Sequence, residues 1–228
     1  MIICHTANYI ITHENDDNFT LFLKNGQNDT KRCLYESIIK TIPHSFSFIN
    51  PETQELHFQA SSFNKIQHLL DFLKNNRISW EQCLLLIGFL SKQIQELEKR
   101  GYSIIGFNLQ DVIMLNESVF LFVNNEYLFS FHNKYVTLVT PLKKPYFSSP
   151  EILQLTKIPA RIHYKSCYYS LASLVVYCLL EEYVFKGNEV KRDDELEITL
   201  KPLFATKMYW FLKRCFVLNP ENRHMLFI

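Results

Sequence analysis

The order of strand and helix patterns along the chain predicts an α+β fold with two parts of unequal size. Short runs of β-forming residues dominate residues 1–60, and helical periodicity dominates residues 61–228. A chain of 228 residues has room for one large domain or two closely packed lobes. We therefore expect a small β-rich lobe over residues 1–60 and a larger helical lobe over residues 61–228.

Strands with one helix are predicted for the β-rich part. Its expected strands are Tyr9–Thr12, Phe19–Leu23, Phe46–Ile49 and Leu56–Gln59. The turn-prone run His13–Asn18 joins the first two strands, and Asn50-Pro51-Glu52 predicts a hairpin between the last two. Residues 31–42 have the pattern of a helix, which Pro43 bounds.

Helices with short strands between them are predicted for the rest of the chain. One helix is expected over residues 62–74, and Ser79 with Gln82 forms a capping-box pattern that opens a long helix ending at Gly101. Short strands are expected at Ile104–Ile105, Val112–Leu115 and Phe120–Val123, and a hairpin at Leu128–Phe131 and Tyr135–Val139. Later expectations are a helix after Ser149, a helix over Ser166–Phe185, a polar linker over Lys186–Glu197 and a last helix over Pro202–Val217.

Composition and charge narrow the function classes. The net charge is +1 and the basic residues are scattered, whereas nucleic-acid binding needs a dense basic face, so no nucleic-acid partner is expected. The six cysteines show no C-x-x-C spacing and are expected to be free thiols. The longest apolar run, Cys167–Leu180, is too short to span a bilayer, and no secretory signal is visible. We therefore expect a cytoplasmic protein without a membrane span.

Four segments, taken in order, carry a resemblance to a known family. They are Gly101–Leu115 (GYSIIGFNLQDVIML), Pro145–Leu153 (PYFSSPEIL), Tyr168–Leu180 (YYSLASLVVYCLL) and Arg214–Leu226 (RCFVLNPENRHML). They resemble the catalytic loop, the end of the activation segment, the buried central helix and the closing segment of a protein kinase. The resemblance implies a protein-kinase-like, two-lobed fold with a reduced β-rich N-lobe and a helical C-lobe. The Asn-, Lys- and Ile-rich composition is similar to that of kinase relatives from large DNA viruses.

The positions that carry the chemistry of a kinase hold other residues. Asn108 stands where the family has its proton-accepting aspartate, and Gln110 replaces the lysine that meets the transferred phosphate. Val112 replaces the metal-binding asparagine, and Asn124 lies where the aspartate of the D-F-G motif is expected. Three chemical roles are therefore lost together, which predicts a protein that does not transfer phosphate.

Other candidate residues nearby have plainer interpretations. Asp111 is the one carboxylate near the loop, and it is expected to be a turn residue bonded to its own backbone. Lys24 is the nearest stand-in for a phosphate-binding lysine, and Gly26 is the only glycine in that region. His163 and Cys167 have a metal-like spacing that no second pair completes. Neither ATP with Mg²⁺ nor a structural metal is expected as a cofactor.

The chain also keeps residues at positions that have a structural role in the family it resembles. Pro150 and Glu151 match the proline and glutamate that close the activation segment, and Arg223 matches the late arginine that family members pair with that glutamate. The resemblance therefore implies a Glu151–Arg223 ion pair. Ser170 stands at the serine of the family's S-L pair in the central helix.

The interpretation is a catalytically inactive kinase homologue, or pseudokinase, that acts as a scaffold or interaction module for protein partners. The groove between its lobes is expected either to be filled by side chains or to bind a partner segment. One alternative is a divergent serine/threonine kinase or nucleotide sensor that uses Asn124 and Asp111 and has measurable nucleotide affinity. Another is a structural component of a larger assembly such as a virion, for which an exposed apolar patch would be evidence.

Overall fold

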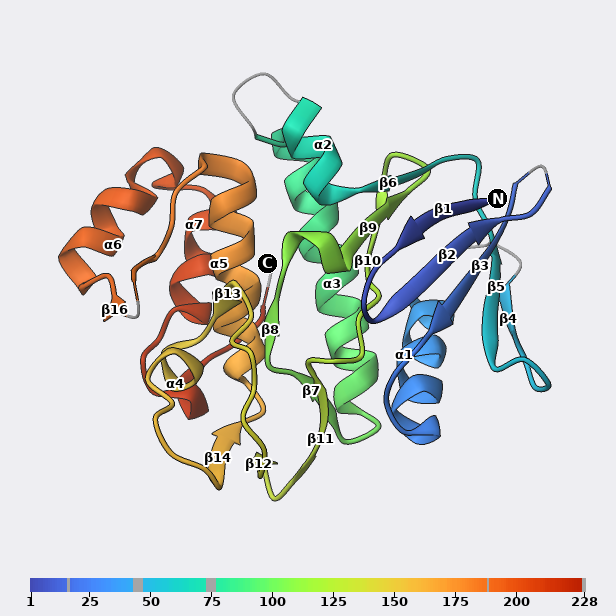
Figure 1. Cartoon of the computed structure of the whole chain (residues 1–228). Coiled ribbons are helices and arrows are strands. Elements are labelled where there is room, and N and C mark those ends of the chain that lie inside the picture. Colours follow the sequence, from blue (N-terminus) through green and yellow to red (C-terminus); the bar gives the residue numbers. More distant parts are fainter. Residues whose placement is uncertain (16, 43–46, 73–76, 188, 227–228) are drawn as a thin grey trace.

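The computed structural model describes residues 1–15, 17–42, 47–72, 77–187 and 189–226. The chain is an α+β protein with several antiparallel sheets, which confirms the predicted class. Figure 1 shows a sheet from the first part of the chain at one end, a long helix in the middle and the last helices at the other end. The expected boundaries at Pro43, Phe46 and Lys74 lie outside the described residues.

The amino-terminal strands form one antiparallel sheet of five strands in the order β1-β2-β3-β5-β4. These are β1 (Ile2–His5), β2 (Tyr9–His13), β3 (Asn18–Leu23), β4 (Ser47–Asn50) and β5 (Glu55–Gln59). The predicted hairpin is confirmed, because β4 and β5 pair from Ser47 opposite Phe58 to Asn50 opposite Glu55. Strand β1 is an addition to the predicted set.

Helix α1 (Asn28–Thr41) joins β3 to β4 and confirms the helix predicted for residues 31–42. Leu34, Tyr35 and Ile38 are buried on one side of it at helical spacing. The hydroxyl of Tyr35 accepts a hydrogen bond of 3.0 Å from the backbone N–H of Leu23 in β3. This bond ties the helix to the third strand.

The segment after the sheet differs from the predicted helix over residues 62–74. It begins as strand β6 (Phe63–Lys65) and turns into helix α2 (Ile66–Phe72) only afterwards. The prediction was wrong for the first residues because they pair antiparallel with a later strand, from Phe63 opposite Leu115 to Lys65 opposite Ile113. Pairing with a distant strand outweighs the local helical pattern here.

Helix α3 (Trp80–Glu98) is the long helix that the capping pattern predicts. The Ser79 hydroxyl accepts from the backbone N–H of Gln82, and the Gln82 side chain accepts from the backbone N–H of Ser79. Gly101 follows the helix with a φ of 75°, a left-handed conformation that glycine adopts without a steric penalty.

Short strands in small sheets connect α3 to the carboxyl-terminal helices. They are β7 (Tyr102–Ile104), β8 (Gly106–Phe107), β9 (Val112–Leu115), β10 (Val119–Phe122), β11 (Leu128–His132), β12 (Tyr135–Leu138), β13 (Phe147–Ser148) and β14 (Ala160–His163). They form the sheets β10-β9-β6, β14-β12-β11-β7 and β13-β8. The second predicted hairpin, between β11 and β12, is confirmed, with Asn133 and Lys134 in its turn at φ values of 47° and 70°.

Two of the carboxyl-terminal helices begin at the predicted residues, Pro150 and Ser166, and the other boundaries differ. The carboxyl-terminal helices are α4 (Pro150–Leu153), α5 (Ser166–Leu180), α6 (Asp193–Leu200) and α7 (Lys207–Cys215), with strands β15 (Phe185–Lys186) and β16 (Glu189–Val190) before α6. The helix predicted over Ser166–Phe185 stops early because Glu181 turns to a φ of 60°. The predicted linker Lys186–Glu197 contains most of α6. The last helix begins at Lys207, not Pro202, because Ala205 has a φ of 63° and Thr206 then caps α7.

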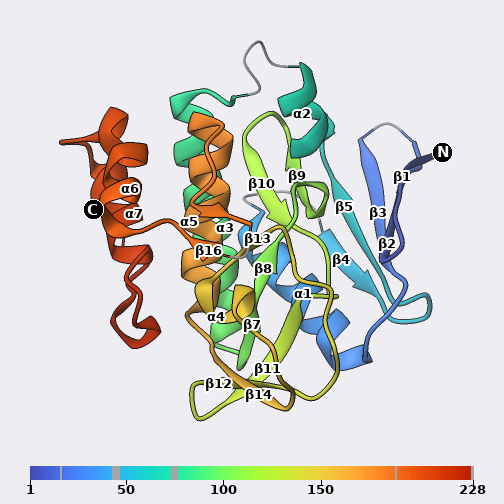
Figure 2. The same cartoon turned by 60° about the vertical axis from the view of Figure 1, so that its left-hand side comes forward.

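The core consists of one large apolar cluster and a smaller second cluster around β12, β14 and α4. Helix α5 is buried on nearly all sides and lies against α3, and Figure 2 shows the two helices side by side. One continuous cluster of apolar side chains includes residues of the five-stranded sheet, of α1 and α3, and of α5 and α7. Among the described residues no helix is both long and apolar enough to cross a bilayer.

Candidate functional site

Residues of the predicted catalytic loop lie in a short 3-10 turn, η1 (Leu109–Asp111), between β8 and β9. Strands β9 and β10 pair antiparallel with Val112 opposite Phe122. The backbone N–H of Val123 then donates to the carbonyl of Asp111 at 3.0 Å. This pairing brings Asn124 beside the loop, so Asn108, Asp111 and Asn124 lie in one cluster. Val112 is buried in the core and offers no ligand.

The amide of Asn108 makes two hydrogen bonds of opposite sense. Its Nδ2 donates to Oδ2 of Asp111 at 2.9 Å, and its Oδ1 accepts from the backbone N–H of Tyr146 at 2.8 Å. Asn108 thus joins the loop to the segment that precedes β13. A carboxylate could accept from Tyr146 but could not donate to Asp111. This position therefore needs both the donor and the acceptor of an amide.

Asp111 is a buried carboxyl, with 1% of its surface exposed. Burial raises its pKa to about 6, and the amides of Asn108 and Asn124 act in the opposite direction. Asp111 lies in a 3-10 turn as expected, but its carboxylate accepts from the Asn108 side chain and not from its own backbone. Asn124 accepts from the backbone N–H of Glu126 at 2.9 Å, while its Nδ2 has no hydrogen bond of normal geometry to the described residues.

The amino-terminal sheet is held directly on this loop. The hydroxyl of Tyr9, at the start of β2, donates to the backbone carbonyl of Gln110 at 2.5 Å. In the β1–β2 turn, Nδ2 of Asn8 donates to Oε2 of Glu126 at 2.6 Å. Tyr9 is fully buried. The β1–β2 turn therefore packs directly against the loop.

A further hydrogen bond joins the residues after β3 to the segment that contains Asn124. Nδ2 of Asn125 donates to the carbonyl of Asn25. Gly26 follows with a φ of 96°, and a Cβ there would lie 2.3 Å from Asn125 Nδ2. Lys24 approaches Nε2 of His5 at 2.8 Å and donates to the carbonyl of Thr6, and among the described residues it forms no ion pair. Gly26 thus lies at the contact between the sheet and the Asn124–Asn125 segment, whereas Lys24 is bound within the sheet region.

A groove of about 600 Å³ remains beside the cluster. Its lining includes Asn108, Gln110, Glu126, Lys143, Tyr146 and Tyr183. Tyr146 donates its hydroxyl proton to the hydroxyl of Tyr183 at 2.8 Å, and the two rings meet edge to face. This wall of the groove is therefore aromatic and has polar hydroxyls at its rim.

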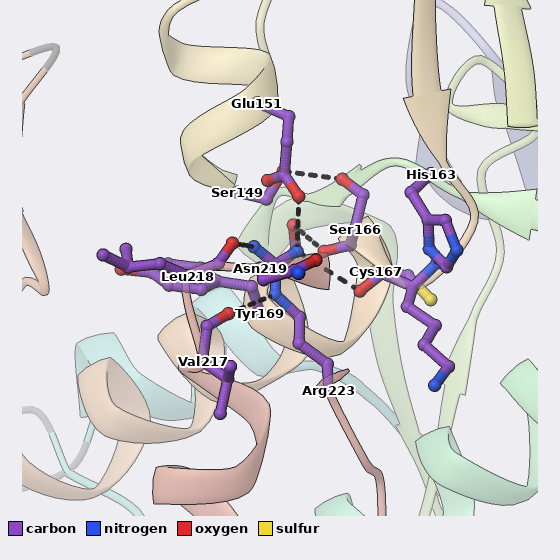
Figure 3. A network of polar contacts seen from close by, with 12 residues as sticks. Ser149, Glu151, His163, Ser166, Cys167, Tyr169, Val217, Leu218, Asn219 and Arg223 are labelled. Atoms are coloured by element: carbon purple, nitrogen blue, oxygen red, sulfur yellow. Dashed lines mark hydrogen bonds and ion pairs between the residues drawn. The ribbon is translucent and has the colours of Figure 1, made fainter. Parts of the chain in front are cut away.

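The structure brings together Glu151 and Arg223, the two residues that the resemblance pairs. Nη1 of Arg223 lies 2.7 Å from Oε1 of Glu151, and the guanidinium lies over the ring of Tyr169 at 5.2 Å from its centroid (Figure 3). The contact joins one nitrogen to one oxygen, and neither carboxylate oxygen has a hydrogen bond of normal angle to the described residues. It is a close charge pair and not a two-bond fork.

Backbone carbonyls satisfy the rest of the Arg223 side chain. Nε donates to Val217 O at 2.7 Å and Nη2 to Leu218 O at 2.9 Å, while Nη1 also reaches Lys165 O at 3.5 Å (Figure 3). The side chain is completely buried. A buried guanidinium needs such partners, because its donors would otherwise be unpaired in a region of low dielectric constant.

Hydroxyl groups continue this network toward the loop. Oγ of Ser149 and Oγ of Ser166 lie 2.6 Å apart (Figure 3). Ser170 donates to Ser166 O at 3.2 Å and approaches Ile105 O at 3.4 Å, close to the start of the loop. Pro150 is buried at the first position of α4 after Ser149, as predicted from the Ser-Pro pair. Ser170 therefore links the central helix to the loop, one turn from Ser166.

The metal-like pair of the sequence does not form a site. Sγ of Cys167 donates to Tyr164 O at 3.2 Å, and Nδ1 of His163 accepts from the backbone N–H of Lys165 at 3.3 Å. Burial raises the pKa of Cys167 well above its usual value and, with the charge of Lys165, lowers that of His163. In the described part of the chain no group of three or more His, Cys, Asp or Glu side chains is placed to hold a metal ion.

Three residues of the site escaped prediction. Tyr9, Glu126 and Tyr146 bond to the loop or to its neighbours, but each lies in a segment whose pattern indicates only a strand or a turn. No protein-family model matches the chain, and no curated protein matches it in sequence. The geometry of the site is therefore the basis for assigning a function.

Proposed function

We propose that the chain is a catalytically inactive protein-kinase homologue that acts as an interaction module for a protein partner. The observation that carries the proposal is the use of Asn108. It stands at the position expected for the catalytic base, and both ends of its amide are engaged in internal hydrogen bonds. A neutral amide held in this way cannot accept a proton from a substrate hydroxyl.

The order of elements supports the kinase-like, two-lobed interpretation. A kinase carries its phosphate-binding lysine on the third strand, paired with a glutamate of the helix that follows. Here β3 is followed by α1, and the glutamate of that helix is Glu36. Glu36 pairs with Arg100 at 3.1 Å and with Arg32 at 2.8 Å, while Lys24 is bound to the β1–β2 turn. This order of strand and helix is like that of a kinase, while Glu36 pairs with arginines in place of a strand lysine.

The direct contact between the sheet and the loop also supports an inactive protein. Phosphoryl transfer needs open space for the phosphates and charges that stabilise them. The bonds from Tyr9 to Gln110 and from Asn8 to Glu126 hold the sheet directly against the loop, and Glu126 places a negative charge beside it. The groove lined by Lys143, Tyr146 and Tyr183 then remains as a surface for a partner segment.

Thermal unfolding with and without nucleotide tests the proposal. Ligand at a hundred times its dissociation constant would raise the melting temperature of a chain this long by about 5–11 °C. We expect no rise in millimolar ATP with Mg²⁺, with Mn²⁺ or with neither. An active protein kinase measured in parallel serves as the positive control. A rise of that size would refute the proposal and favour a nucleotide sensor that uses Asp111 and Asn124.

A further inference from the structure

Exposed apolar side chains gather on the last two helices. Ile198 of α6, Phe204 between the helices and Trp210 of α7 are 71%, 69% and 55% exposed. Figures 1 and 2 both place α6 and α7 at the end of the molecule away from the five-stranded sheet. Single exposed apolar residues are ordinary, but several on neighbouring elements indicate an interaction surface.

Tyr209 holds these elements in fixed relation to each other. Its ring meets Phe204 and Trp210 edge to face, with centroid separations of 5.5 Å and 5.1 Å. Its hydroxyl donates to Oε2 of Glu197 in α6 at 2.8 Å. Tyr209 therefore holds the exposed rings of Phe204 and Trp210 in place on the surface.

The two helices carry opposite charges. Four of the first five residues of α6 are acidic: Asp193, Asp194, Glu195 and Glu197. The segment 201–214 has four basic residues and no acidic residue: Lys201, Lys207, Lys213 and Arg214. Asp194 lies one turn before Ile198, and Lys207 lies one turn before Trp210. Each helix thus presents a charge beside an exposed apolar side chain.

Internal ion pairs leave much of this charge without a partner. Lys213 pairs with Glu197 across the two helices. Asp194 pairs with Arg192 at 3.1 Å, but both side chains are largely exposed, so that contact is weak. Within the described residues Lys201 and Lys207 form no ion pair. The surface therefore offers basic groups and an acidic helix start to a partner at the same time.

We propose that this surface, the α6–α7 face, docks against the same face of a second copy of the chain. We define the α6–α7 face by Asp194, Ile198, Lys201, Phe204, Lys207 and Trp210. In a two-fold dimer every contact occurs twice, so the acidic start of α6 in each copy meets Lys201 and Lys207 of the other. The exposed Ile, Phe and Trp side chains then lie at the centre, where aromatic residues contribute most to binding.

The chain itself supplies both halves of the complementary pair, which favours a second copy over other occupants. A flat anionic membrane would attract Lys201 and Lys207 but would repel the acidic start of α6 beside them. A purely acidic partner segment would meet the same repulsion. The dimer is independent of the proposed lack of catalysis, and its failure would leave that proposal untouched.

Sedimentation velocity on the full chain tests the dimer. At concentrations up to about 100 μM, where micromolar contacts are populated, we expect a concentration-dependent dimer. Trp210→Ala should weaken it by at least about tenfold, as is typical of a central aromatic anchor. The matched control is Trp80→Ala, which removes the other tryptophan, 37% exposed at the start of α3. A monomer throughout, or a dimer that Trp210→Ala leaves unchanged, would overturn the proposal.

Charge exchange between two variants gives a second, independent measurement. The double variants Asp193→Lys/Asp194→Lys and Lys201→Glu/Lys207→Glu should each be folded and monomeric, because like charges then face each other. An equimolar mixture should form the heterodimer, since each variant restores both contacts of the other. The substitutions lie on the surface, and circular dichroism verifies folding. Folded variants that stay monomeric when mixed would rule out the proposed charge pairing.

Discussion

At position 108 the side chain must donate one hydrogen bond and accept another. Its donor reaches the carboxylate of Asp111 and its acceptor takes the backbone N–H of Tyr146. Aspartate at this position would place a second carboxylate next to Asp111, and two carboxylates this close cannot both ionise without a large cost. Asn108 therefore fits the hydrogen bonds that this position requires, and its neutral amide is not a base that could accept a proton.

The buried carboxyl of Asp111 makes stability depend on pH. Its pKa rises from 3.8 to about 6 on folding, so the folded state binds the proton more tightly than the unfolded state. The associated stability is fully present below pH 3.8 and is lost as the pH rises through 6. Asp111→Asn removes this dependence, and it should raise the free energy of unfolding at pH 7 by about 2–3 kcal/mol relative to the natural chain.

Urea unfolding of both proteins at several pH values measures that difference. The gain from Asp111→Asn should be small near pH 4 and should grow until about pH 7. Asp71→Asn, at an exposed position on α2, serves as the control and should show no such growth. A difference between Asp111→Asn and the natural chain that stays constant over this pH range would contradict the expectation.

The loop residues of the site could be read from the sequence, but their bonding and the residues that contact them from other segments could not. The pattern around Asn108 indicates its position in the loop and the absence of a carboxylate there. Its partner Tyr146 lies 38 residues away, and the Asn8–Glu126 bond joins residues 118 apart. Contacts of this range depend on how the elements pack, and no local pattern encodes them.

At the scale of elements, the segment after α7 acts as a brace for the central helix. Arg223 reaches back to α4 through Glu151, to the start of α5 through Lys165 O, and to its own segment through Val217 O and Leu218 O. One side chain therefore connects three segments that lie apart in the sequence. Its removal would leave buried groups without partners on all three.

Substitutions of this pair should lower stability to different extents. Arg223→Ala leaves Glu151 without its counter-ion and two carbonyls without a donor, so the free energy of unfolding should fall by about 3–5 kcal/mol. Glu151→Gln keeps the carbonyl contacts of Arg223 and should cost less, about 1–3 kcal/mol. Chemical denaturation of both variants measures the two losses.

The control for this series is Arg192→Ala. Arg192 is highly exposed and pairs only with side chains of the same surface turn, so its removal should change stability by no more than about 0.5 kcal/mol. Unchanged stability in both Arg223→Ala and Glu151→Gln would show that the pair does not brace the fold.

Element boundaries were predicted well where a standard signal marks them. The capping box at Ser79 and the Ser149-Pro150 pair both gave correct helix starts. Two errors lie where a residue other than glycine adopts a positive φ, at Glu181 and at Ala205, and a third lies at β6, which pairs with a distant strand. Side chains with a Cβ rarely adopt a positive φ, so the sequence carries no breaker at the first two positions, and tertiary packing decides.

At the scale of the whole molecule, the larger of two apolar clusters joins the five-stranded sheet to the helices. Gln93 of α3 is fully buried, and its Nε2 donates to Ser37 of α1 at 3.2 Å and to Phe122 O at 2.8 Å. Its Oε1 accepts from the backbone N–H of Phe122 at 2.8 Å. Together with the bond from Tyr9 to Gln110, these contacts couple the first part of the chain to the rest.

This coupling predicts one cooperative unfolding transition for the full chain. Calorimetry should give a calorimetric enthalpy close to the van't Hoff enthalpy. A fragment with residues 61–228 should show no cooperative transition, because the face of α3 that packs on α1 would be exposed to water. A folded fragment with sharp near-ultraviolet dichroism, or two separate transitions in the full chain, would contradict this expectation.

The α+β class was predictable because strand patterns precede helix patterns along the chain. The packing of the β1–β2 turn against the loop was not predictable, since Asn8 and Tyr9 look like ordinary turn and strand residues. The long-range pairing of β6 with β9 was hidden for the same reason. Hydrophobic periodicity indicates which helices and strands form, whereas the way in which they pack together depends on contacts between distant residues.

The position of Arg223 near the end of the chain has a consequence for synthesis. Glu151 leaves the ribosome 72 residues before its counter-ion. At synthesis rates of about 5–20 residues per second, the carboxylate therefore waits roughly 4–14 s for the guanidinium. During that interval the start of α5 is present without the group that fixes it. A chain that stops before Arg223 keeps every strand and helix of the described residues but lacks the side chain that connects α4 and the start of α5 to the segment after α7.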